Sequence, residues 1–457
     1  MNRIAAVVAG LSLAFAGTSA TIADTINVPG DYLFITQAIA VASDGDVINI
    51  ASGTYYQWVL NPGGKAITIQ GTLNADGTLA TTIDGLQNGS VFEINSGESN
   101  ATVIKNLVIT GGSRNDSDGG GGLFCQFSSP TITGCTFDNN TTSSQGGGMF
   151  LYNNSNPTII DCIFSNNIAE NQGGGLSLDS NSVPQIINCT FVNNEATDGG
   201  GIFLGGSRDI SGLTFIGNSA TSTGGAMYAN GGTYSNNTFE SNTARDGGAT
   251  GPGGKFINCE FVSNIALESG GACYSADDIE GCTFTSNHAT NGGAIFSGSL
   301  LVSNSILKSN SAASYGGGIY GSSLQIAECE LTNNTSILGG AIYSASSNPA
   351  NAHSIVDSTI CGNSTPQILW DWNDFQGNSI DDLCDGIGQA CCLGATTPCL
   401  VLPPAECEAF GGVSFDNSYS CGSIECPSSC PGDTNNDGFV GVDDILVVIA
   451  EFGVTCP

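Results

Sequence analysis

Between residues 135 and 363, apolar and polar positions follow one recurring pattern. An aromatic or aliphatic anchor is followed by Asn three residues later, usually by Ala two residues further on, and then by Gly-Gly and another apolar residue, as in 189–202 and 282–295. The anchors are Phe137, Phe164, Phe191, Phe215, Phe239, Phe261, Phe284, Leu307, Leu331 and Ile360, spaced 22 to 29 residues apart. A period in this range predicts a solenoid in which each repeat forms one coil.

The residue types within a period indicate the kind of solenoid. Each repeat holds two or three short runs rich in Ile, Val, Thr, Phe and Tyr, separated by Asn, Gly and Ser, and no stretch has helical periodicity. Such runs predict short β-strands, so we expect an all-β fold. Leucine-rich repeats share the period but need Leu in a set frame, which is absent.

Stacked coils bring equivalent residues into columns about 4.8 Å apart. The Asn column therefore predicts a side-chain amide ladder at a tight bend, where Asn also tolerates left-handed backbone angles. It consists of Asn140, Asn167, Asn194, Asn218, Asn242, Asn264, Asn287, Asn310, Asn334 and Asn363. The Gly-Gly pairs predict a second bend. An inward column with room only for small side chains is predicted at Ala169, Ala196, Ala220, Ala244, Ala266, Ala289 and Ala312.

This pattern resembles the polymorphic outer-membrane protein repeat, in which Phe-x-x-Asn is followed by Gly-Gly-Ala-Ile. The resemblance covers about half of the chain and implies a right-handed parallel β-helix of the pectin-lyase-like class. We expect this solenoid over 24–380, with the main repeats at 103–363. Residues 24–70 resemble the N-terminal cap and first coils of such proteins, where a short amphipathic helix covers strand edges that would otherwise be exposed.

The chain start is typical of a secretory signal peptide, predicted over 1–23. A basic residue precedes an apolar run from Ile4 to Gly17, and small residues follow, so we expect cleavage after Ala20 or Ala23. A membrane anchor would need about 20 apolar residues, and no later segment is long and apolar enough to span a bilayer. We therefore expect a secreted, extracellular or cell-surface protein with no membrane span.

The charge balance excludes several partner classes. The 457 residues include 65 Gly, 41 acidic and only 8 basic residues, so the formal net charge is −33, and removal of Arg3 with the signal peptide makes it more negative. Binding to nucleic acid or anionic lipid depends on clustered Lys and Arg, so neither is expected. With 40% hydrophobic residues the chain can still bury a core.

Cysteines fall into two groups. Six occupy the same repeat position, two residues before the anchor: Cys135, Cys162, Cys189, Cys259, Cys282 and Cys329. A metal site needs four ligands around one point, whereas a column places these cysteines one after another along the axis. We therefore interpret them as small packing residues, with disulfides between adjacent coils as the alternative. Cys125 and Cys273, on the strand after Gly-Gly, are interpreted in the same way.

The second group lies beyond the repeats and predicts a disulfide-rich module over 381–428. Six cysteines lie within 36 residues. Because so small a module cannot bury a sufficient core, we expect three disulfides to stabilise it, with 15 possible pairings. They are Cys391, Cys392, Cys399, Cys407, Cys421 and Cys426. Further pairings of Cys361 with Cys384 and of Cys430 with Cys456 are consistent with the spacing. Zinc is the alternative, but this region lacks His.

The segment 429–457 contains a calcium-loop pattern. Oxygen ligands at loop positions 1, 3, 5 and 12, with Gly at position 6, match the geometry that Ca²⁺ requires. Asp433, Asn435, Asp437 and Asp444 supply side-chain oxygens, and Phe439 supplies its carbonyl oxygen. The alternative is a solvated acidic turn.

Asp at position 12 and a single following helix resemble the dockerin repeat. That resemblance implies a cohesin-like partner. A cohesin-binding dockerin normally has two such repeats, whereas this chain has one, so the cohesin-contacting residues of that family are not transferred.

An enzymatic function is tested against the residues that the pectin-lyase-like class uses. The Gly-His-Gly and Arg-Ile-Lys strings of polygalacturonases are absent, and the few basic residues are scattered. The strongest local candidate is Arg114 with Asp116 and Asp118, which we interpret as a polar loop with local ion pairing. We interpret the patch of Asp277, Asp278 and Glu280 as solvated, and His288 as surface variation. We assign no catalytic residue.

Two functions remain. The preferred one is a structural, adhesive or glycan-contacting rod with a calcium-binding end, whose partner is an extracellular polysaccharide or a cell-surface component. The alternative is an extracellular polysaccharide lyase or glycoside hydrolase attached through its dockerin-like end. The strongly acidic chain disfavours polyuronate substrates.

Overall fold

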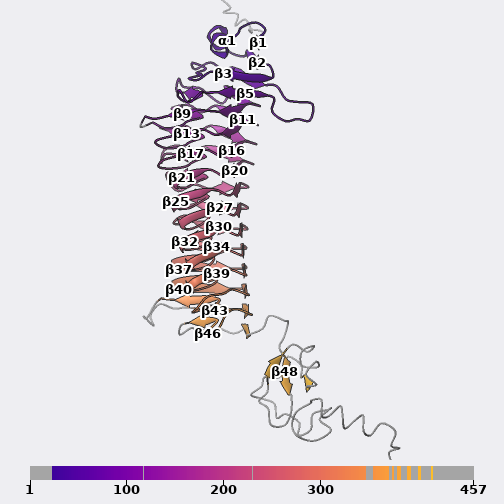
Figure 1. Ribbon diagram of the computed structural model, residues 1–457, viewed down its shortest axis with the longest axis vertical. Helices are drawn as coiled ribbons and strands as arrows, with labels where there is room; N and C mark the ends of the chain where they lie inside the picture. Colours follow the sequence, from indigo (N-terminus) through magenta and orange to yellow (C-terminus); the bar gives the residue numbers. More distant parts are fainter. Residues whose placement is uncertain are drawn as a thin grey trace, which may run out of the picture.

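The computed structural model describes residues 23–116, 118–228, 230–345 and 354–369, then 373–374, 378–381, 389–392, 400–402 and 413–414. Strands stack coil upon coil into a parallel β-solenoid of about fourteen turns (Figure 1). No helix of the described part is long and apolar enough to cross a membrane. The all-β solenoid expected from the repeat is confirmed.

Each face of the rod consists of parallel sheets in which strands pair with their equivalents in neighbouring coils. The longest face has fourteen strands and carries the anchors: β3 Gly53–Tyr56, β5 Thr81–Asp84, β8 Val108–Thr110, β12 Thr136–Asp138, β16 Ile163–Ser165, β20 Thr190–Val192, β24 Thr214–Ile216, β28 Thr238–Glu240, β31 Glu260–Val262, β35 Thr283–Thr285, β38 Ile306–Lys308, β41 Glu330–Thr332, β44 Thr359–Cys361 and β47 Ser379–Asp381.

The next face has nine strands, between the Asn bend and the Gly-Gly bend: β9 Ser113–Arg114, β13 Thr141–Thr142, β17 Ile168–Ala169, β21 Glu195–Asp198, β25 Ser219–Thr223, β29 Thr243–Asp246, β32 Ile265–Ser269, β36 His288–Asn291 and β39 Ser311–Tyr315. A six-stranded sheet follows the Gly-Gly bend in the first coils: β6 Phe92–Ile94, β10 Leu123–Gln126, β14 Met149–Tyr152, β18 Leu176–Leu178, β22 Ile202–Leu204 and β26 Met227–Tyr228.

A seven-stranded sheet closes the first coils: β1 Thr25–Val28, β2 Val47–Ile50, β4 Thr68–Gly71, β7 Val103–Lys105, β11 Thr131–Thr133, β15 Thr158–Ile160 and β19 Gln185–Ile187. An eleven-stranded sheet serves the later coils: β23 Ile210–Ser211, β27 Thr233–Ser235, β30 Lys255–Ile257, β33 Cys273–Tyr274, β34 Asp278–Glu280, β37 Ile295–Ser303, β40 Ile319–Ala327, β42 Ile342–Ser344, β43 Ser354–Val356, β45 Ile368–Leu369 and β46 Asn373–Asp374. Because β37 pairs with both β33 and β34, two faces merge there.

The core consists of inward side chains in register. In the fourteen-stranded sheet, Phe137 pairs with Phe164 and Phe164 with Phe191, and the rings of all seven Phe anchors are stacked with centroids 4.5–5.1 Å apart. These rings are fully buried. Burial and stacking of equivalent aromatic rings therefore bind each coil to the next.

The amide ladder is confirmed. All ten Asn residues of the column are buried, and each of the first nine donates an Nδ2–H to the Oδ1 of the next at 2.9–3.0 Å. The left-handed residue at this bend is, however, the one before the ladder Asn, as at Asn139, Asn166 and Asn193. The ladder Asn points inward, and its predecessor makes the turn.

The Gly-Gly bend and the Ala column are also as predicted. Gly173, for example, has φ +62°, and a Cβ on Gly174 would lie 2.5 Å from the carbonyl oxygens of Glu195 and Gly200. The seven Ala side chains of the inward column are at most 5% exposed. The second glycine of each pair is thus required by close backbone contact between coils.

A short helix, α1 (Ile35–Val41), buries Ile35, Ala38 and Ile39 and contacts β1 and β2. The structure therefore has a helix where the sequence predicted one, while its capping role stays a prediction. The predicted signal peptide lies outside the described residues except for Ala23. In the predicted disulfide-rich module, β48 Gln389–Cys392, β49 Leu400–Leu402 and β50 Val413–Ser414 form a small antiparallel sheet.

The cysteines of the repeats are buried inside the rod. Eight of them are free thiols: Cys125, Cys135, Cys162, Cys189, Cys259, Cys273, Cys282 and Cys329. Burial raises the pKa of Cys135 to about 12 and that of Cys329 to about 11. These positions agree with packing residues, and no inter-coil disulfide forms in the described part of the chain. Cys384, the proposed partner of Cys361, and the Cys430 to Cys456 pair lie outside that part.

Candidate functional site

Arg114 joins the carboxylates that the sequence placed near it. Its guanidinium lies 2.7 Å from Asp116, 3.1 Å from Asp118 and 3.4 Å from Glu93 of the preceding coil. It also lies over the Phe124 ring, 4.4 Å from the centroid. The side chain is only 12% exposed. This arrangement is the local ion pairing expected from the sequence, extended by Glu93.

The interpretation of Asp277, Asp278 and Glu280 as a simply solvated patch was incomplete. Lys255 of β30 lies in register with Asp278, and its Nζ lies 3.0 Å from Asp278 and 2.8 Å from Glu280. The hydrogen bond to Glu280, and next that to Asp278, raises the pKa of Lys255. Asp277 accepts a hydrogen bond from the Gly254 backbone. His288 opens β36 on the surface, as expected.

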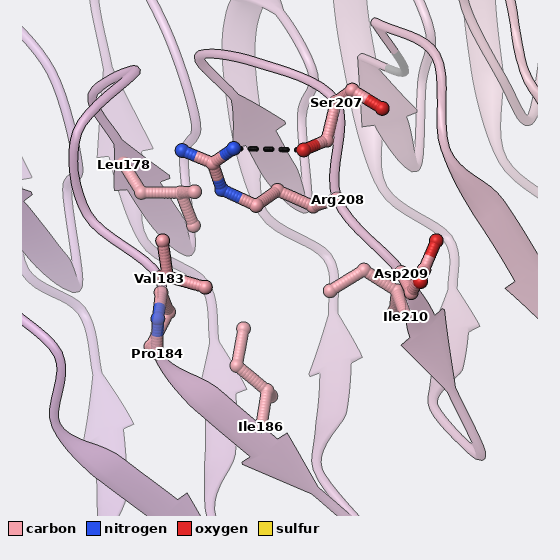
Figure 2. A pocket seen from close by; sticks show the side chains of 8 residues that line it. All are labelled: Leu178, Val183, Pro184, Ile186, Ser207, Arg208, Asp209 and Ile210. Carbon is pink, nitrogen blue, oxygen red and sulfur yellow. Dashed lines mark hydrogen bonds between the residues drawn. The ribbon is translucent and has the colours of Figure 1, made fainter.

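A pocket of about 350 Å³ lies where the stack of β1 to β19 ends and that of β23 begins. The anchor spacing falls from 27 to 24 residues in the same coil. Figure 2 shows Arg208 reaching across the pocket, with Leu178, Val183 and Pro184 on one side and Ile210 on the other. Arg208 donates to the carbonyl oxygens of Ser180 (2.6 Å), Ser182 (3.1 Å) and Ser207 (2.7 Å). It therefore links two coils where the strand ladder is interrupted.

A partly exposed column of aromatic rings follows the Gly-Gly bend. It consists of Phe203, Tyr228, Tyr274, Phe296, Tyr320 and Tyr343, each the outward residue of its strand. Ring centroids lie 4.8 Å apart for the first pair and 4.6–5.6 Å apart from Tyr274 to Tyr343. Gly251 interrupts the column between Tyr228 and Tyr274. We call these six residues the aromatic column.

A second column lies on the other side of the same bend, at the ends of the nine-stranded sheet. It runs through Gln145, Gln172, Asp198, Thr223, Asp246, Ser269 and Asn291 to Tyr315. We call these residues the polar column, and the two columns together the bend face. Amide, hydroxyl and carboxylate groups thus run parallel to a line of aromatic rings.

The two columns touch across the bend at Tyr315. The Tyr315 ring lies 4.7 Å from that of Tyr343 and 6.4 Å from that of Tyr320, measured between centroids. Burial raises the pKa of Tyr228, and the neighbouring Asp198 carboxylate raises it further. Burial likewise raises the pKa of Tyr320. These hydroxyls therefore stay protonated at neutral pH and can donate hydrogen bonds.

The chemistry of the bend face suits a polyhydroxylated ligand. Within each stacked run the ring faces are covered by neighbouring rings, so the column presents ring edges and tyrosine hydroxyls to a ligand, and the amides, hydroxyls and carboxylates of the polar column add hydrogen-bonding groups. The repeat pattern did not lead us to predict this face. The sequence feature that could have indicated it is an aromatic residue two positions after the Gly-Gly-Ala or Gly-Gly-Gly segment of the bend, as at Phe296 and Tyr320.

The calcium-loop residues Asp433, Asn435, Asp437, Phe439 and Asp444 lie outside the described residues. Within the described ranges, no group of three or more His, Cys, Asp or Glu side chains is arranged to hold a metal ion.

Comparison with protein families supports the architecture. Residues 80–244 match the right-handed β-helix region family, and residues 281–298 match the Chlamydia polymorphic membrane protein repeat. No curated protein matches. Together with the coil stacking, these matches support a right-handed β-helix fold.

Several solved structures are similar at low identity. A mannuronic-acid-specific polysaccharide family 6 lyase from human gut microbiota shares 12% identity, with a TM-score of 0.38, covering 77% of this chain and 83% of that one. The A-module of the Azotobacter vinelandii mannuronan C-5 epimerase AlgE6 shares 13%, with a TM-score of 0.36 and coverage of 76% and 93%. The receptor-binding tailspike of bacteriophage Det7 shares 10%, with a TM-score of 0.33 and coverage of 83% and 79%. We transfer no residue role or activity from them.

Proposed function

We propose that this protein is a secreted or cell-surface rod that contacts extracellular glycans through the bend face. The observation that carries the proposal is the parallel course of a stacked aromatic column and a column of hydrogen-bonding side chains, which meet at Tyr315. Both columns follow the rod axis over successive coils, with one interruption of the aromatic column at Gly251, so a polymer aligned with the axis meets aromatic and hydrogen-bonding groups in several coils. Many weak contacts then add up to useful affinity.

The charges of the face favour a neutral glycan. Asp198 of the polar column is partly exposed, whereas Asp246 is only 8% exposed and is paired with the neighbouring Arg245 at 3.0 Å. With a net charge of −33, the chain repels acidic polymers as a whole. We therefore expect neutral polysaccharides to bind more tightly than polyuronates.

Affinity electrophoresis of the full chain in gels containing cellulose derivatives, xylan, mannan or polygalacturonate tests this function. Tyr320→Ala and Tyr343→Ala should each weaken retardation by a neutral polysaccharide at least about fivefold, because each removes an aromatic ring worth roughly 1 kcal/mol or more. Phe127→Ala is the matched control, because Phe127 is a 60% exposed aromatic residue outside the bend face. Unaltered retardation in both Tyr variants, or no retardation of wild type by any glycan, would exclude this role.

We propose separately that the C-terminal loop binds Ca²⁺. Asp433, Asn435, Asp437 and Asp444 would supply side-chain oxygens, and Phe439 its carbonyl oxygen. This set is all oxygen, as Ca²⁺ requires. The loop would order the C-terminal segment without contributing to the β-helix.

Calorimetric scans with and without chelator test the calcium proposal. Removal of Ca²⁺ should lower or abolish a transition of the tail and leave the main transition of the rod unchanged. Asp437→Ala should behave as the chelated wild type at any calcium concentration, whereas Asp416→Ala, outside the loop, should retain the calcium effect. Identical scans with and without chelator would rule the site out.

A further inference from the structure

A second exposed apolar surface lies near the N-terminal end of the rod, far in sequence from the bend face. Tyr56 is 60% exposed, Trp58 41%, Val59 45% and Leu86 48%. We call these four residues the N-terminal patch. Trp58 is the one tryptophan in the described part of the chain, since Trp370 and Trp372 lie outside it.

Two neighbouring loops present this patch. Tyr56 of β3 is in register with Asp84 of β5, so the segments that follow these strands lie in adjacent coils. Hydrogen bonds from Gln57 N to Asp84 O (3.0 Å) and from Val59 N to Ser90 O (2.8 Å) hold the two segments together. A Cβ on Gly89 would touch both Trp58 and Val59, at 3.7 and 3.8 Å. The indole therefore rests on the next coil.

The backbone of both loops is strained at apolar residues. Val59 has φ +55° and Leu86 has φ +52°. A left-handed conformation is a genuine outlier for a β-branched residue, and surrounding structure must impose it. Leu60, the next residue, is fully buried and fixes the loop in the core. The chain thus holds Val59 and Leu86 outward at an energetic cost.

A pocket of about 280 Å³ adjoins the patch, between α1 and the loop that follows Val59. Thr36, Val59, Asn61 and Lys65 are among its lining residues. Lys65 Nζ donates to the carbonyl oxygens of Ile39 (2.6 Å) and Ala40 (3.1 Å), which anchors the ammonium at the end of α1. Two of its three N–H donors are used in this way, which leaves one for a ligand oxygen.

We propose that the N-terminal patch and this pocket form a binding site for a neutral oligosaccharide. One sugar ring would stack on Trp58 and Tyr56, while the adjoining residue would enter the pocket beside Asn61 and Lys65. A protein partner needs about 800 Å² on each side, more than four side chains offer, whereas one or two sugar rings match this size. The overall charge of −33 disfavours an acidic ligand. This site is separate from the bend face and does not depend on it.

Fluorescence of the full chain carrying Trp370→Phe and Trp372→Phe reports on Trp58 alone. Titration with cellopentaose or mannopentaose should change its emission and lower its quenching by acrylamide at least twofold. Tyr56→Ala should weaken the response at least fivefold. Phe127→Ala and the bend-face variant Tyr320→Ala should leave it unaltered, so the two glycan proposals are tested independently.

Three results would overturn the proposal. The first is an unchanged Trp58 signal with every neutral oligosaccharide. The second is a stronger response to oligogalacturonate than to neutral probes. The third is protection of Trp58 that depends on protein concentration instead of sugar, which would assign the patch to contact with a second copy of the chain. A circular dichroism spectrum like that of wild type keeps the Tyr56→Ala result interpretable.

Discussion

Asn218 shows what one side chain contributes to the stack. Its Oδ1 accepts bonds from the backbone N (3.0 Å) and the Nδ2 (2.9 Å) of Asn194, and its own Nδ2 donates to Phe191 O (2.9 Å) and to Asn242 Oδ1 (3.0 Å). All of these groups are buried. A buried amide in this position therefore satisfies polar groups of both neighbouring coils.

Asn218→Ala should lower the free energy of unfolding by about 3 kcal/mol, because it leaves two buried donors of Asn194 without an acceptor. Urea titration followed by circular dichroism measures the change. Thr221→Ala, at an exposed position of β25, which begins directly after Asn218, should cost less than about 0.5 kcal/mol. A similar loss in both variants would mean that the ladder contributes little.

The buried thiols should make the rod sensitive to alkali. The pKa values of Cys135 and Cys329 are raised to about 12 and about 11 by burial. Above about pH 8.5 the unfolded chain releases these thiol protons, whereas the folded state keeps them. The free energy of unfolding therefore falls as the pH rises from that value toward the pKa values of the thiols in the folded state. The urea midpoint should be lower at about pH 10 than at about pH 8, and Cys135→Ala should lose less across this interval. An equal loss in the variant would contradict this account.

At the scale of the element, the Gly-Gly bend determines how closely coils approach. At Gly174, an added Cβ would lie 2.5 Å from two backbone carbonyl oxygens, and neither can move without shifting a strand. At Gly298, in β37, a Cβ would meet nothing within 4 Å, and φ is not in the left-handed region. Gly174 is therefore required by close backbone contact, whereas the structure leaves space for a side chain at Gly298.

Gly174→Ala should destabilise the protein by about 2 kcal/mol or more through overpacking, whereas Gly298→Ala should be nearly neutral. Differential scanning fluorimetry of the two variants gives the comparison. A thermal midpoint for Gly174→Ala within one degree of that of Gly298→Ala would show that the bend tolerates a side chain.

At the scale of the whole molecule, the excess of negative charge opposes folding. The described ion pairs use three cations, Arg114, Arg245 and Lys255, so most carboxylates have no partner of this kind. Raising the NaCl concentration from about 10 mM to about 150 mM should therefore raise the thermal midpoint by a few degrees, because it screens self-repulsion. An uncharged osmolyte at equal osmolarity serves as the control. A midpoint that stays flat or falls with salt would mean that self-repulsion is negligible.

The repeat was predictable because it is local. Phe anchors, inward Asn and Ala, and Gly-Gly bends recur in one order. The residues of each repeat therefore determine the conformation of their own coil, and the strand register follows from the stacking of equal coils. The left-handed residues were misplaced by one position, since a string of two Asn residues does not say which one turns and which one points inward. Arg114 was identified together with Asp116 and Asp118, but Glu93 comes from another coil.

The sequence by itself determined an all-β solenoid, its period, its buried columns and its strong negative charge, because these depend on residue type and spacing alone. Only the tertiary structure decided which outward residues meet. Tyr315 touches Tyr343 across a bend, Lys255 reaches Asp278 one coil away, and Trp58 rests beside Gly89. Such contacts join residues more than twenty positions apart, and their geometry depends on how each coil closes, which spacing does not specify.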